Sequence, residues 1–186
     1  SAASDVYKRQ ILDLGVYKAI RRLIVPADLE LIRLHRVLQE AYGWRGSHLY
    51  DFTIFEKGPR ETAARLVAGK EDLFYDENAT LIAGHRLSEY LPKYKYVLYT
   101  YDFGDHWKHK IELVRIIEDY GKESPYLLEA KGQAPPEDVG GTGGYLEFRE
   151  IMLNPEHPDH EETKKWAGYW SPELTEWESR PRLIRV

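Results

Sequence analysis

A β-hairpin is predicted by the segment YKYVLYTYDFGDHWKHKIELVRII, which occupies residues 94–117. Residues 94–101 are rich in Tyr, Val and Thr, which favour strands, and Gly104 with Asp105 supplies the turn. After the turn, Trp107, His109 and Ile111 share one face, because successive strand residues point to opposite faces. The segment therefore predicts two long antiparallel strands with a polar and aromatic tip.

Further elements are predicted on both sides of this hairpin. Hydrophobic periodicity and turn residues indicate strands at 11–14 and 19–25, a helix at 30–42, a strand at 48–55, a short helix at 86–91, a strand at 126–130, and helices at 145–153 and 160–169. Residues 60–85 show no decisive pattern. Antiparallel strands with helices near both ends of the chain predict one α+β domain, with a mixed, mainly antiparallel sheet and helices packed on one side.

The composition fits a single globular domain and excludes several classes of site. Hydrophobic residues make up 42% and charged residues 31% of the 186 residues, which is ordinary for a domain that buries its own core. There is no cysteine, so disulfides, thiolate zinc sites and cysteine nucleophiles are excluded. No apolar run approaches the roughly 20 residues that span a bilayer, and no signal peptide is visible. We therefore expect a cytoplasmic protein without a membrane partner.

The charge distribution bears on nucleic-acid binding. Basic side chains gather near the N-terminus and acidic ones near the C-terminus, within a net charge of -5. A domain that binds nucleic acid by neutralising phosphates usually has the opposite balance, so the net charge disfavours this role. A solvated basic face is the simpler interpretation. The side chains that would carry DNA binding are Arg21, Arg22, Arg33 and Arg36.

The first ten residues, SAASDVYKRQ, resemble a translated sequencing adapter. We therefore expect residues 1–10 to be a non-native segment and residues 11–186 to form the domain.

The hairpin tip combines groups that suit metal binding or acid–base chemistry, namely Asp102, Asp105, His106, Trp107 and His109. Carboxylates and imidazoles bind zinc, manganese or iron, and an imidazole beside a carboxylate serves proton transfer. Strand geometry points His109 and His106 to opposite faces, so the tip alone does not predict a three-ligand site. A purely structural alternative is that Asp102 caps the turn, Gly104 takes a positive φ and Trp107 packs into the core.

A second polar loop, PPEDVGG, occupies residues 135–141. Glu137 and Asp138 offer oxygens, and Gly140 and Gly141 offer backbone N–H groups for an anion or a metal. The loop lacks the Lys and Ser/Thr of a phosphate loop, and no nucleotide motif, HExxH helix or nucleophile elbow occurs elsewhere. The alternative is that the prolines stiffen a crossing and the glycines permit close packing before a helix.

Two single histidines, His35 and His48, flank Trp44 in the sequence. A lone histidine is more often a hydrogen-bonded core or rim residue than a ligand. Each could still join the two polar turns, because spacing along the chain does not reveal the convergence of distant segments.

The chain resembles the plasmid pRiA4b Orf-three-like family, whose members include insertion-sequence passenger proteins named TnpR. The resemblance covers roughly residues 11–177 and rests on Val25-Pro26-Ala27, Leu34-His35, Gly43-Trp44, His48-Leu49, the 101–109 and 135–141 motifs, His157-Pro158 and Trp166. It implies a single α+β domain of unestablished activity that is encoded on plasmids or near mobile elements.

The chain differs from this family in two respects: it lacks the features of a resolvase, which the name TnpR implies, and it lacks the cysteines of some members. A resolvase needs a nucleophilic serine in a catalytic domain and a basic helix-turn-helix, which this chain lacks. Family members often carry cysteines around the Pro-Pro-Glu-Asp loop, where this chain has Leu128, Ala134 and Val139. A cysteine-based metal or redox role is therefore excluded here.

These observations predict a cytosolic binding domain linked to mobile DNA, which meets an unidentified protein partner without catalysis. The first alternative is a metal-dependent, hydrolase-like enzyme, with a divalent metal held by His48, Asp102, His109 or Glu137. The second alternative is a DNA-binding accessory protein. The candidate functional surface comprises His35, Trp44, His48, Asp102, Asp105, His106, Trp107, His109, Glu137, Asp138, Gly140 and Gly141.

Overall fold

A computed structural model describes residues 5–168, 170 and 178–186. Its helices are α1 (Leu31–Tyr42), α2 (Gly141–Leu153) and α3 (His160–Ala167), with 3₁₀ turns at Lys70–Phe74 and Leu87–Glu89. Its strands are β1 (Asp5–Asp13), β2 (Lys18–Pro26), β3 (Tyr50–Phe55), β4 (Thr62–Val67), β5 (Ala79–Leu81), β6 (Tyr96–Tyr101), β7 (Trp107–Ile117), β8 (Tyr126–Lys131), β9 (Glu178–Ser179) and β10 (Arg182–Leu183).

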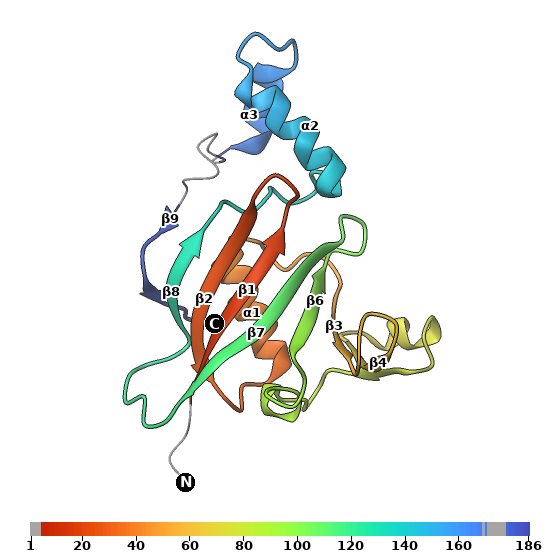
Figure 1. The fold of residues 1–186 in the computed structure, drawn as a ribbon. Coiled ribbons are helices and arrows are strands. Elements are labelled where there is room, and N and C mark those ends of the chain that lie inside the picture. Colours follow the sequence, from red (N-terminus) through yellow and green to blue (C-terminus); the bar gives the residue numbers. More distant parts are fainter. Residues whose placement is uncertain (1–4, 169, 171–177) are drawn as a thin grey trace.

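The described strands form one sheet in the order β10-β8-β2-β1-β7-β6-β3-β4-β5, with β9 also pairing with β8. Every pair is antiparallel except β4–β5. Helix α1 lies against one face of the sheet, while α2 and α3 pack together beyond one end of it (Figure 1). The predicted α+β class with a mainly antiparallel sheet is therefore confirmed. Among the described residues, no helix combines the length and the hydrophobicity that a membrane-spanning segment requires.

The predicted hairpin forms the middle of the sheet. Tyr101 pairs with Trp107 and Tyr99 with His109, and these four side chains are buried on the face that α1 covers. The alternation predicted from the sequence is therefore observed, because one face of β6 and β7 packs into the core while the other faces outward.

Helix α1 ends at Gly43, as its sequence predicts. Gly43 has φ 75°, the left-handed conformation that glycine adopts without a steric penalty, and its N–H donates to Glu40 O. Trp44 follows at once, donates its N–H to Gln39 O and stacks on Tyr101 at 5.0 Å between ring centroids. The helix end therefore fixes a tryptophan against the hairpin.

Strand β1 begins earlier than the sequence predicted. Its residues from Asp5 onward pair with both β2 and β7, so part of the segment 1–10 lies in the centre of the sheet. Lys8 is fully buried there, its Nζ has no hydrogen-bond partner among the described residues, and burial holds its pKa well below the usual range. Residues 1–4 lie outside the described residues. That residues 1–10 are foreign to the domain stays a prediction.

The remaining differences concern element ends and short edge strands. The strands β4, β5, β9 and β10 had no predicted counterpart. Helix α2 begins at Gly141, four residues before its predicted start, because the run of glycines conceals the helical turn. The predicted end of the last helix, Tyr169, lies outside the described residues.

Candidate functional site

The turn between β6 and β7 meets the segment 135–144, which comprises the polar loop and the first turn of α2. The N–H of Gly140 donates to Asp105 Oδ2 at 3.2 Å. A Cβ added to Gly141, which has φ 68°, would lie 3.0 Å from Asp105 O. The two polar segments, far apart in sequence, therefore share one surface, which we call the turn–loop junction and define as residues 102–106 and 135–144.

Asp102 organises the turn. Its Oδ1 accepts hydrogen bonds from the N–H groups of Gly104 at 2.9 Å and Asp105 at 3.2 Å, and its own N–H donates to Leu49 O at 2.9 Å. The positive φ expected at Gly104 occurs instead at Asp102 (60°) and His106 (58°). Asp tolerates this conformation because its short side chain bonds to the local backbone. Asp102 thus caps the turn with one oxygen and leaves Oδ2 for another contact.

His48 connects the two segments. Its Nε2 lies 2.9 Å from Asp138 Oδ1 and 3.6 Å from Asp102 Oδ2, and the three ligand atoms lie within 4.8 Å of one another. His48 precedes β3, Asp102 follows β6 and Asp138 belongs to the loop. The sequence offered both Glu137 and Asp138 as oxygen donors for a metal, and the structure brings Asp138 to His48.

Glu137 fixes the loop and takes no part in the group around His48. Its Oε1 accepts from Tyr101 Oη at 2.5 Å and from the N–H of Arg45 at 3.2 Å. Burial, and then the Glu137 carboxylate, raise the pKa of Tyr101 to about 12. Trp44 donates its indole N–H to Pro135 O at 3.0 Å and holds the start of the same loop. The prediction of Glu137 as a metal ligand is therefore not supported by the geometry.

His109 lies in the aromatic core, away from the group around His48. The rings of Tyr42, Trp44 and Tyr99 surround it at centroid distances of 4.6, 5.2 and 5.2 Å. Its ring nitrogens have no hydrogen-bond partner among the described residues. Burial, and then the charge of Arg21, lower the pKa of His109 to about 3. The prediction of His109 as a metal ligand is not supported by the geometry, because its register on β7 turns it toward α1, whereas His106 is exposed at the tip.

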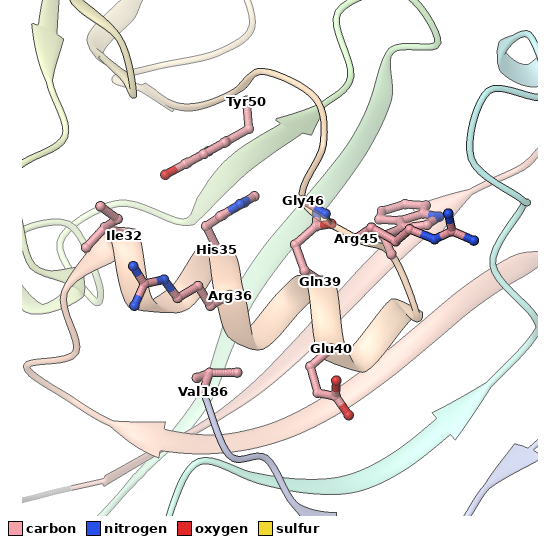
Figure 2. Close-up of a pocket in the computed structure, with 10 residues that line it drawn as sticks. Ile32, His35, Arg36, Gln39, Glu40, Arg45, Gly46, Tyr50 and Val186 are labelled. Atoms are coloured by element: carbon pink, nitrogen blue, oxygen red, sulfur yellow. Dashed lines mark hydrogen bonds between the residues drawn. The ribbon is translucent and has the colours of Figure 1, made fainter.

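His35 belongs to a different pocket. Its ring stacks on Tyr50 at 3.6 Å, and its Nδ1 lies 2.7 Å from Tyr99 Oη. Burial, and then Arg36, lower its pKa to about 4. Figure 2 shows His35 between α1 and Tyr50, in a pocket whose lining does not include His48, Asp102 or Asp138. His35 therefore matches the hydrogen-bonded core histidine that was its simpler interpretation.

The four arginines suggested for DNA binding do not form one patch. Arg21 is buried and donates to the carbonyl oxygens of Ala41, Ile20, Gly132 and Lys131 at 2.7–3.1 Å. Arg22 points to the opposite face and pairs with Glu129 at 3.0 Å. Arg33 and Arg36 are exposed on α1. A joint nucleic-acid surface made by all four side chains is therefore contradicted, because Arg21 is committed to the interior.

The close approach at Gly141 gives a testable prediction. Gly141→Ala should lower the free energy of unfolding by about 1–3 kcal/mol, because it forces a side chain into positive φ and against Asp105. The matched control is Gly143→Ala, since a Cβ at Gly143 meets nothing within 4 Å and alanine favours a helix. Urea unfolding of both variants checks the prediction, and equal stability of the two would contradict it.

Comparisons with known proteins agree with this architecture. The family model for plasmid pRiA4b ORF-3-like proteins matches residues 10–179. The uncharacterized protein y4hQ of Sinorhizobium fredii (strain NBRC 101917 / NGR234) is 41% identical over 171 residues, which cover 89% of this chain and 82% of that protein.

A solved structure gives the same fold. The crystal structure of MM3350, a protein of unknown function from Methanosarcina mazei Go1, superimposes with a TM-score of 0.79 at 28% identity. The match covers 93% of this chain and 98% of that one. With a family model that spans most of the domain, these likenesses show that the chain belongs to the plasmid pRiA4b ORF-3-like family.

Proposed function

We propose that the chain is a non-catalytic binding domain of the cytoplasm, associated with mobile DNA, which captures a protein partner at the turn–loop junction. The observation that supports this proposal is the interlocking of the two segments. Backbone and side-chain bonds from Asp105, Tyr101 and Trp44 hold the loop 135–144 in place. A surface held in this way loses little conformational entropy on binding, which favours affinity.

The side chains left exposed next to the junction suit protein recognition. Asp138 is 70% and Trp166 52% exposed, and both line a pocket whose wall also includes Arg45 and Glu137. Tryptophan and arginine are the residues that most often dominate binding energy in protein interfaces. The exposed Asp138 carboxylate in the same pocket as the indole favours a partner segment with a basic side chain, because a cation can contact both a carboxylate and a ring face.

The test uses the purified chain as bait in extracts of its host, with bound proteins identified by mass spectrometry. Asp138→Ala and Trp166→Ala should each reduce capture of a specific partner at least about tenfold, the effect of losing one interface anchor. Tyr75→Ala is the matched control, because Tyr75 is 90% exposed but belongs to neither the junction nor its pocket. Capture of the same partner at wild-type level by both junction variants would refute the proposal.

A further inference from the structure

His48, Asp102 and Asp138 form a group with the donor types of a transition-metal site. One imidazole nitrogen and two carboxylate oxygens come from three separate segments and lie within 4.8 Å of one another. Neutral imidazole with carboxylates binds zinc and manganese, whereas magnesium and calcium prefer oxygen ligands alone. The donor set therefore points to a divalent transition ion.

The two distances from His48 Nε2 are close to those that a shared ion requires. Ligands bound at 2.0–2.2 Å in a tetrahedral arrangement lie about 3.4 Å from one another, and in an octahedral one about 3.0 Å. The observed separations from His48 Nε2 are 2.9 Å to Asp138 Oδ1 and 3.6 Å to Asp102 Oδ2. Both separations from the imidazole nitrogen therefore lie near the expected values, and the two carboxylate oxygens lie within 4.8 Å of each other.

A simple ion pair accounts less well for the same contacts. His48 Nε2 is shielded from solvent and has no hydrogen-bond partner among the described residues, although Asp138 Oδ1 lies only 2.9 Å away. The oxygen is therefore close to the nitrogen but off the direction that a ring N–H would need. An ion placed along the lone-pair direction of Nε2 could bind both carboxylate oxygens, because ligands of one ion lie at an angle to the nitrogen–metal bond.

Charge and pre-organisation favour a cation at this point. Asp102 is only 7% exposed, and two carboxylates beside one imidazole carry more negative charge than an imidazolium can neutralise. Hydrogen bonds from Gly104 and Asp105 to Oδ1 fix the Asp102 carboxylate and leave Oδ2 directed at His48. Such outer contacts orient ligands in protein metal sites.

We propose that His48 Nε2, Asp102 Oδ2 and Asp138 Oδ1 bind one divalent transition-metal ion such as zinc, which ties the hairpin turn to the acidic loop. Three protein ligands leave at least one coordination position for water or another ligand. Asp138 also lines the pocket with Arg45 and Trp166, so the ion adjoins that pocket. The site does not depend on the proposed protein partner, because the isolated chain supplies all three ligands.

The test measures zinc binding by the full chain, purified without an affinity tag, stripped with a chelator and dialysed. Competition with a chromogenic chelator should show one zinc ion per chain. His48→Ala and Asp138→Ala should each weaken zinc affinity by about a hundredfold, as expected for loss of one of three ligands. Asp102→Asn keeps the oxygen that caps the turn and should weaken the zinc affinity to a similar extent.

The matched control is His157→Ala, which removes another histidine that lies 3.9 Å from an aspartate, Asp159. Its zinc affinity should equal that of the unsubstituted chain. Should Asp102→Asn fail to fold, Asp138→Ala decides, because Asp138 is 70% exposed and its side chain carries little of the core. Absence of stoichiometric zinc, or affinity that Asp138→Ala leaves unchanged or that His157→Ala reduces as much, overturns the proposal. A variant that loses partner capture but keeps its zinc affinity would concern the proposed protein binding and not the metal site.

Discussion

Arg21→Ala is expected to destabilise the domain by about 3–5 kcal/mol, a large share of the stability of a small domain. The Arg21 guanidinium is fully buried and donates to carbonyl oxygens of Ile20, Ala41, Lys131 and Gly132. Truncation leaves these acceptors, two of which are in fully buried hydrogen bonds, without their donor.

The location of these carbonyls explains why the effect should be large. Ala41 O belongs to the last turn of α1, whose carbonyls have no partner within the helix, and Gly132 O follows the end of β8. The guanidinium also lies over the Tyr42 ring, 4.4 Å from its centroid. One side chain therefore joins β2, α1 and the loop that leads into the turn–loop junction.

Urea unfolding of matched variants measures this contribution. Arg22→Ala is the control, because Arg22 makes a partly exposed pair with Glu129 and should lose no more than about 1 kcal/mol. Arg21→Lys should recover only part of the stability, since an ammonium lacks the planar fork that reaches several carbonyls. A loss below about 1 kcal/mol in Arg21→Ala would contradict this account.

The elements predicted well from the sequence are those whose signal is local. The hairpin of β6 and β7 carries its own alternation and turn, and α1 carries both its apolar spacing and its C-terminal Gly43. The strand β4 pairs with the preceding strand β3 but was missed because residues 60–85 show no decisive pattern. The short strands β5, β9 and β10 at the margins of the sheet carry too few residues for a clear alternation. The start of β1 was missed for a different reason, since residues 1–10 resemble an adapter and were set apart from the domain, although Asp5 and Lys8 are buried in the sheet.

The side on which Arg21 lies was not decided by the sequence. Ala19, Leu23 and Val25 share its face, while Ile20 and Ile24 share the face of Arg22, so both faces of β2 are similarly apolar. Only the packing of α1 against one face separates the two arginines.

The candidate site shows the same limit. The two polar turns were identified by composition, but the choice between Glu137 and Asp138 as the neighbour of His48 depends on the path of the loop. The imidazole of His109 suits a metal ligand, but the side chain lies on the strand face that packs into the core. Strand alternation predicted only that His109 and His106 point to opposite faces, and it did not predict which of the two is buried. Site residues from separate segments therefore needed the three-dimensional arrangement.

Acidification from pH 7 to pH 4 is expected to reduce the free energy of unfolding by about 3 kcal/mol for each of the two buried histidines. Burial lowers the pKa of His109 to about 3 and that of His35 to about 4. Arg21 adds to the effect at His109, and Arg36 at His35. The aromatic neighbours Tyr42, Trp44 and Tyr99 supply no negative charge that would stabilise a protonated His109.

The direction follows from proton binding by the two states. In the unfolded chain a histidine titrates near pH 6.5, whereas the folded domain keeps His109 neutral down to about pH 3. The unfolded state therefore binds more protons throughout this window, and stability falls as the pH falls. Above about pH 7 both states are neutral at this position, so this histidine adds no pH dependence there.

The variant His109→Phe isolates this contribution. Phenylalanine fits an aromatic surrounding, and no hydrogen bond is lost among the described residues, since the ring nitrogens of His109 have no partner there. At pH 7.5 the variant should be at least as stable as the unsubstituted chain, because burying a polar ring without partners is unfavourable. Between pH 7 and pH 4 it should lose about 3 kcal/mol less.

Urea unfolding of both proteins at several pH values gives the comparison directly. Carboxylates that titrate in the same range contribute equally to the two proteins, so the difference between their unfolding free energies reports on His109 alone. That difference should be constant above about pH 7 and should grow steadily below pH 6.5 in favour of the variant. A difference that stays constant down to pH 4 would mean that His109 takes up its proton in the folded domain, and the aromatic core around it would then have to open to water or rearrange.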